Sequence, residues 1–284
     1  MQGKRSPSAA RRQLGARLRQ LRSQSKLTGA QVGAQIGCTH ATISKIENGN
    51  TVPDLAQLDR LLDLYQVTDT EDRTLFRQLL DDASGDGWWE AYDDVLPHKF
   101  GTYLGMEVDA ESINAYESTL VHGLLETRDY ASALLHSVRL NQFPEEIERL
   151  VDVRMRRKEL LTADQPLQLS VVMEEAVIRR PLGGPEVMRA QLEYLLEAQQ
   201  MPNVSIQILP FSVGAHPGLN GSLTVLEFPD EPAIGYTEGP SGNNYLTKPR
   251  EISRCKLILS KLREAALSPE ESSALIAQVA KEMK

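Results

Sequence analysis

The residues with the clearest chemical meaning form one short polar row in the first fifth of the chain. If Ile43 and Ile46 of one helix point into a core, the residues spaced i, i+1, i+4, i+5 and i+8 from position 40 point outward. The outward row then consists of His40, Ala41, Ser44, Lys45 and Asn48. It is short, polar and free of acids. Such a surface can enter the major groove of duplex DNA and touch the base edges.

The charge distribution favours the same chemistry. Residues 1–50 contain nine Lys and Arg and a single acid, Glu47, whereas the rest of the chain contains 22 basic and 38 acidic residues. The net charge of −8 is therefore the sum of a cationic first fifth and an anionic remainder. This asymmetry predicts a basic module directed at a polyanion. We expect Glu47 to pair within its own domain rather than to read a base.

Five short helices are predicted to position the polar row. The first spans 11–25 and carries Leu14, Leu18 and Leu21 on one face. Thr28 can cap the second helix and Gly37 can end it, and Thr39 can cap the third, which ends at Gly49. A fourth follows Asp54, and a fifth covers 72–81. Residues 1–10 lack periodicity, and we interpret them as a disordered basic arm.

This region resembles the repressor-like, XRE-type helix-turn-helix family of phage and bacterial regulators. The resemblance rests on Leu27-Thr28, Gly37, the run from Ile43 to Gly49, and Pro53. It implies a domain over 11–82 that binds a DNA operator as a homodimer. The DNA-binding positions that we expect are Arg12, Thr28, Gln31, Thr39, His40, Ala41, Thr42, Ser44, Lys45 and Asn48. The family usually has Gln where this chain has Gly29, which keeps only a backbone N–H for a contact to the DNA phosphates.

An acidic segment separates this domain from the rest. Residues 81–94 contain six acids and no Lys or Arg. Beyond the segment, helices are expected at 127–138, 144–161 and 185–200, and another ends near Leu120. Strands are expected at 167–173, 204–211, 223–228 and 233–238, the last two as a hairpin. The predicted fold class is α+β: an all-α five-helix repressor-like domain, then a mixed domain over 83–284 with a mainly antiparallel sheet of about four strands.

The larger domain resembles the C-terminal domain of unknown function of actinobacterial WhiJ-type regulators. The matching segments include Trp88-Trp89-Glu90, Tyr116–Thr127, Arg179–Met188, Leu209–Gly218 and Leu267–Glu271. The resemblance implies a transcription regulator, which we expect to be a repressor. It also implies a small partner protein encoded beside it, in a pair likened to antitoxin and toxin. The family more often has Pro and Gln where His122 and Glu126 stand.

Candidate ligand or partner residues in this part are Trp88, Trp89, His216 and Asn243. For His216 the alternative is a hydrogen bond that holds its loop, and for the 239–244 segment the alternative is a plain turn. The histidines lack metal-ligand spacing, and the chain has no nucleophile elbow, phosphate loop or dinucleotide fingerprint. We therefore expect no catalytic residues, no metal and no cofactor.

Two features bear on the compartment. Cys38 and Cys255 lie far apart in the sequence, and no apolar run has the ~18 residues of a membrane helix. The first residues do not form a secretory signal. The sequence thus predicts a cytoplasmic regulator without a membrane partner. The sequence fits three functions: a regulator that receives a signal from a partner protein, a regulator that senses a small molecule, and an antitoxin-like protein.

Overall fold

The computed structural model describes residues 7–85, 87–97, 100–139, 142–229, 231–239 and 242–283. The chain divides into two compact units, the first comprising residues 1–93 and 98–109, and the second 94–97 and 110–284. Among the described residues, no helix is both long enough and apolar enough to cross a membrane. The boundary near residue 82 that we inferred from the acidic segment stays a prediction.

The first unit is entirely helical. Its elements are α1 (Pro7–Gln24), α2 (Gly29–Ile36), α3 (His40–Glu47), α4 (Leu55–Leu64), α5 (Thr70–Ala83), the 3₁₀ helix η1 (Trp88–Tyr92) and α6 (Phe100–Asp109). Capping boxes open α2 at Thr28 and α4 at Asp54. In each, the side chain of the cap residue accepts from the backbone N–H of the third helical residue. The side chain of that third residue in turn accepts from the backbone N–H of the cap residue, so the helix start is fixed locally. Residues 1–6 of the expected arm lie outside the described residues, and α1 already begins at Pro7.

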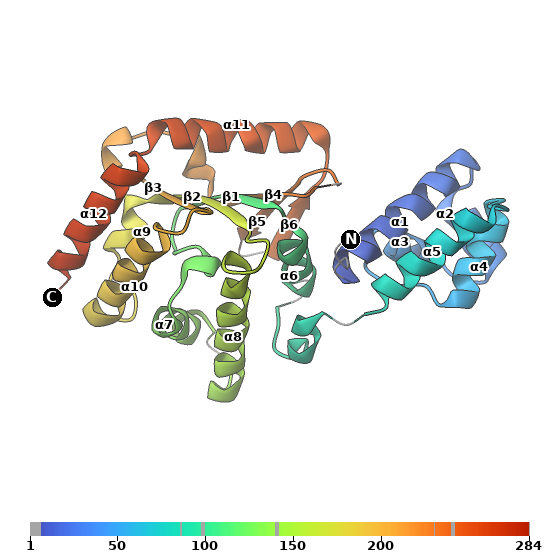
Figure 1. Cartoon of the computed structure of the whole chain (residues 1–284), viewed down its shortest axis with the longest axis horizontal. Coiled ribbons are helices and arrows are strands. Elements are labelled where there is room, and N and C mark those ends of the chain that lie inside the picture. Colours follow the sequence, from blue (N-terminus) through green and yellow to red (C-terminus); the bar gives the residue numbers. More distant parts are fainter. Residues whose placement is uncertain are drawn as a thin grey trace. The chain divides into compact units, whose positions relative to one another are not determined.

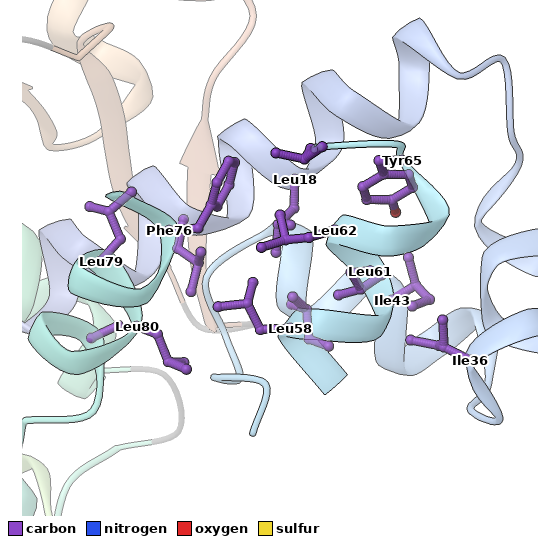
Figure 2. Close-up of a cluster of buried hydrophobic side chains, with 14 of the residues drawn as sticks. Leu18, Ile36, Ile43, Leu58, Leu61, Leu62, Tyr65, Phe76, Leu79 and Leu80 are labelled. Carbon is purple, nitrogen blue, oxygen red and sulfur yellow. The ribbon is translucent and has the colours of Figure 1, made fainter. Parts of the chain in front are cut away.

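The core of this unit is formed by the apolar faces of α1 to α5. Leu18, Ile36 and Ile43 converge with leucines of α4 and with Phe76 of α5 (Figure 2). At least 95% of the surface is buried for each member of this cluster: Leu18, Ile36, Ile43, Leu58, Leu61, Leu62 and Phe76. At roughly 1.5–3 kcal/mol for each buried Leu, Ile or Phe, this cluster dominates the stability of the unit. The helices that the sequence predicted therefore meet in a single core.

The second unit contains a six-stranded mixed sheet. Its strands are β1 (Ser112–Glu117), β2 (Gln168–Glu174), β3 (Val204–Leu209), β4 (Leu223–Glu227), β5 (Ile234–Gly239) and β6 (Gly242–Leu246). Their order is β3-β2-β1-β4-β5-β6. Strands β1, β2 and β3 pair in parallel, whereas β4, β5 and β6 add antiparallel.

The expected sheet of about four, mainly antiparallel strands was therefore wrong in detail, although the α+β class is confirmed. The four predicted strands occur within two residues of their expected bounds. The sequence missed β1 and β6. Ser112, Asn114 and Glu117 interrupt the apolar pattern of β1, which we assigned to a helix, and β6 is rich in Gly and Asn, which favour turns. Both segments become strands because neighbouring strands pair with them.

Helices cover both faces of the sheet. They are α7 (Arg128–Val138), α8 (Pro144–Arg157), the short α9 (Glu175–Arg179), α10 (Pro185–Ala198), α11 (Pro249–Ala265) and α12 (Pro269–Glu282). Short 3₁₀ turns lie at Gly123–Leu125, Lys158–Leu161, Phe211–Val213 and Pro217–Asn220. Figure 1 shows α11 along one face, with α7, α8 and α10 on the other.

The outer edge of β3 is closed by side chains. Gln199 bonds both the N–H and the C=O of Ile206, and the Ser272 hydroxyl accepts from the N–H of Ile208. The N–H of Leu267 donates to the C=O of Ile208. The edge is thus blocked against pairing with another strand.

Candidate nucleic-acid interface

The α2–α3 pair forms a tight helix-turn-helix. Gly37 ends α2 with φ 80°, a left-handed conformation that favours glycine, and its N–H donates to the C=O of Gly33. Thr39 then opens α3 by accepting from the N–H of Thr42 at 3.1 Å. Because both helix ends are fixed by local bonds, the turn sets the direction of α3.

Helix α3 separates an apolar face from a polar one. Ile43 and Ile46 are each 2% exposed. Most of the remaining predicted residues are exposed: Thr39, His40, Ala41, Lys45 and Asn48, together with Thr28 and Gln31 of α2, whereas Thr42 and Ser44 are half-buried. The structure thus brings these predicted positions onto neighbouring helices.

His40 packs against the start of α2. A Cβ atom at Gly29 would lie 2.7 Å from Cδ2 of the His40 ring, closer than such atoms approach. Gly29 is the position where the resembling family usually has Gln. The absence of a side chain there is what allows His40 to lie across the first turn of α2. Sequence reasoning missed this coupling because the two residues face each other only once the turn is built.

Glu47 is drawn into the domain as expected. Its side chain is 4% exposed and takes a two-pronged ion pair from Arg22, with Nε–Oε1 2.5 Å and Nη2–Oε2 2.9 Å. The hydrogen bond to Glu47 raises the pKa of Arg22. Arg22 also donates to the C=O of Leu27. The only acid of the first fifty residues is therefore neutralised within the fold.

Asn48 is tied to α1. Arg19 donates to Oδ1 of Asn48 at 2.6 Å, and the amide of Asn48 donates to the hydroxyl of Ser44 at 3.3 Å. Arg19 also lies 3.4 Å from Oε2 of Glu47. The carboxyl end of α3 is thus braced by an arginine that the candidate set did not include. The 28-residue separation of Arg19 and Glu47 gave no local signal in the sequence.

Arg12 is placed differently from the other candidates. Its guanidinium lies 3.0 Å from Asp109, and its side chain is 15% exposed. The neighbouring Arg11 donates to the C=O of Ala83 and to Glu90. These two arginines attach helix α1 to three other elements, which are α5, η1 and α6. Both guanidinium groups therefore donate to protein acceptors.

Thr28 and Gln31 form the capping box of α2. The Gln31 carbonyl accepts from the N–H of Thr28 at 2.8 Å and from its hydroxyl at 2.9 Å. The Gln31 amide group is thereby oriented at the exposed amino end of the helix. Backbone N–H groups at such an end attract phosphate oxygens.

The candidate ligand residues do not converge. Trp89 is 6% exposed and, like Trp88, belongs to the first unit, where the two rings meet edge to face. Asn243 lies within β6, opposite Glu238 of β5, rather than in a loop. Among the described residues, no group of three or more His, Cys, Asp or Glu side chains is placed to hold a metal ion.

His216 is held by its neighbours. Its Nε2 lies 3.1 Å from Oε1 of Glu174, and its ring meets that of Tyr116 edge to face. The Tyr116 hydroxyl donates to the same Glu174 oxygen at 2.5 Å, and burial raises the pKa of Tyr116. The structural alternative for His216, a hydrogen bond that fixes the loop between β3 and β4, agrees with this geometry.

Both units match known protein families. Residues 13–75 match a family described as a helix-turn-helix domain. Residues 100–278 match a domain of unknown function, DUF5753. The chain belongs to the DUF5753 family. This agrees with an XRE-type regulator that carries such a domain after its helix-turn-helix, and it supports a DNA-binding regulator. No match was found among curated proteins or solved structures.

Proposed function

We propose that this DUF5753 protein is a sequence-specific transcription regulator that places α3 in the major groove of its operator. The observation that carries the proposal is which charged side chains of α3 are buried and which are exposed. Glu47, its one acid, is buried against Arg22, while Lys45 and His40 are exposed. An acid-free helix face of this kind can approach polyanionic DNA and present donors to base edges.

The candidate residues divide into two roles in this proposal. Thr39, His40, Ala41, Ser44 and Lys45 face the bases. The amino end of α2, with Thr28 and Gln31, and Asn48 at the end of α3 bind phosphates, which position the protein without reading sequence. Arg12 can take part only if it leaves Asp109.

The finer proposal concerns assembly and signal. The protein acts as a repressor and binds as a homodimer, with one α3 in each of two half-sites about one helical turn apart. The acidic second unit dimerises and receives a signal from a small partner protein encoded beside it. The resemblance to WhiJ-type regulators supports this arrangement. A signal of this kind changes DNA affinity by the partner's differential binding to the two states.

The experiment begins with selection of preferred sites from a random duplex library by the full-length chain. On the selected site, Lys45→Ala is expected to bind about five- to a hundredfold more weakly, since a lost base contact costs about 1–3 kcal/mol. Lys281→Ala, which removes an exposed lysine of α12 in the second unit, is the matched control and keeps full affinity. Enrichment of no sequence, or equal binding by Lys45→Ala and wild type, contradicts the proposal.

A further inference from the structure

On the three parallel strands, the sheet face beneath α11 is apolar in only one half. Tyr116, Val172 and Leu209, near the carboxyl ends of the three parallel strands, are buried against Leu259 and Leu262 of α11. This cluster holds α11 to the sheet, along whose face the helix runs in Figure 1.

On the three parallel strands the amino-terminal half of the same face is polar, whereas Val225 of β4, which pairs with Asn114, is buried and apolar. Asn114 and Ser170 each stand two residues before a member of the buried cluster, so they project from the same side of the sheet. The strand register places Asn114 beside Ser170, and Ser170 beside Ser205. All three are half-buried. Within the described part of the chain, the Ser170 and Ser205 hydroxyls have no hydrogen-bond partner. Hydroxyl groups thus line a partly open strip of the sheet.

A cavity of about 180 Å³ lies where α11 meets Asn114, the β1 member of this strip. Its walls are formed by residues of β1, β4 and α11: Asn114, Val225, Glu227, Lys256, Leu259, Ser260 and Arg263. At about 30 Å³ for a water-sized group, the space corresponds to about six such groups. The cavity therefore suits a small molecule.

Arg263 is the unbalanced charge of this cavity. Its guanidinium donates to Oδ1 of Asn114, and no carboxylate of the described residues lies within ion-pair distance of it. The other cation of the wall, Lys256, is paired with Glu227 at 2.9 Å. A guanidinium carries five N–H donors in a planar fork, so Arg263 retains donors for a further acceptor. The cavity thus offers a positive group without a counter-ion.

We propose that this cavity binds a small monocarboxylate. Its carboxylate pairs with Arg263, whose planar fork matches carboxylate geometry. Its short hydrocarbon part lies against Val225 and Leu259, which form the apolar wall. Because Lys256 and Glu227 neutralise each other, Arg263 leaves the walls with one net positive charge, which favours a monoanion over phosphate or a dicarboxylate. The proposal concerns binding alone and does not depend on the DNA-binding function.

The test is calorimetric titration of the full-length chain with acetate, butyrate, hexanoate and benzoate, and with inorganic phosphate and succinate. We expect saturable binding of one or more monocarboxylates, and weaker or no binding of phosphate and succinate. Arg263→Gln is expected to lower the affinity by about tenfold or more, since a hydrogen bond to a charged group is lost. Arg254→Gln, which removes an exposed charge from the same helix outside the cavity, should leave it unchanged.

A second variant guards against misfolding of the first. Ser260→Phe fills the cavity from an exposed position of α11, and it should abolish binding while the unfolding midpoint stays near that of wild type. The proposal is overturned if no monocarboxylate binds at up to about 10 mM. It is also overturned if Arg263→Gln binds as tightly as wild type, or if phosphate binds as well as the monocarboxylates.

Discussion

At the scale of single residues, the contact between Gly29 and His40 has the sharpest consequence. The His40 ring occupies the space that a side chain at position 29 would need. Gly29→Ala should therefore displace His40 from the first turn of α2 and weaken binding to the selected DNA site by about three- to thirtyfold. The reason is that, in the proposed docking, a group that faces the bases moves while the phosphate contacts remain.

His40→Ala provides the matched comparison. If Gly29 acts only through His40, the double variant should bind no more weakly than His40→Ala alone, because coupled residues are not additive. Affinities from fluorescence anisotropy on the selected duplex measure both effects. Fully additive losses would show that Gly29 acts by another route.

At the scale of elements, the segment 121–127 is clamped by α8 and α10. Arg154 of α8 donates to both oxygens of Glu126 at 2.7 Å, and Lys158 donates to the C=O of Glu126. Gln191 of α10 donates to the C=O of Leu125 and accepts from the N–H of Thr127. His122 is 3% exposed within this segment. The positions where the family more often has Pro and Gln are thus structural in this chain.

His122 is predicted to contribute stability that is lost in acid. Burial, aided by Arg157 and Arg154, lowers the pKa of His122 from 6.5 to about 3. At this position the unfolded chain therefore binds one more proton than the folded chain between these pH values, and the contribution of His122 to the free energy of unfolding falls as pH falls through them. The slope for one group is about 1.4 kcal/mol for each pH unit well below pH 6.5.

Urea denaturation of wild type and His122→Gln between about pH 7 and pH 4 measures this term. The stability difference should shift in favour of the variant by about 2–3 kcal/mol as pH falls, because glutamine has no proton to bind. The exposed His136→Gln serves as the control and should show no such shift. A pH-independent difference between His122→Gln and wild type would contradict the buried, neutral state of His122.

The elements also show what the sequence could and could not predict. The α2–α3 pair was predictable because its caps, Thr28, Gly37 and Thr39, act within a few residues. Strand β1 was not, since Asn114 and Glu117 break its apolar pattern and its structure depends on pairing with β2 and β4. The partners of Arg12 and Asn48 are likewise distant in sequence. Local chemistry therefore predicted the candidate interface, and contacts between distant segments decided which side chains remain available for it.

At the scale of the whole molecule, the net charge of −8 conceals a cationic first fifth. Arg11, Arg12, Arg19 and Arg22 are engaged by protein groups in the structure. Arg17 and Lys45, by contrast, have no ion-pair partner among the described residues. Cations without an ion-pair partner, such as Arg17 and Lys45, can replace counter-ions on DNA. We therefore expect the salt dependence of DNA binding to reflect few phosphate contacts, well below the number of arginines in the first fifty residues.

Arg17→Gln tests this expectation through the slope of log affinity against log salt concentration, measured on the full-length chain. If Arg17 neutralises one phosphate, the slope should fall in magnitude by about 0.9, and affinity should drop alike for selected and random duplexes. Arg254→Gln removes the same charge from the second unit and should leave the slope unchanged. A slope change in the Arg254 variant would instead mean that the acidic unit also touches the duplex, so that the charge asymmetry does not divide DNA-facing from solvent-facing parts.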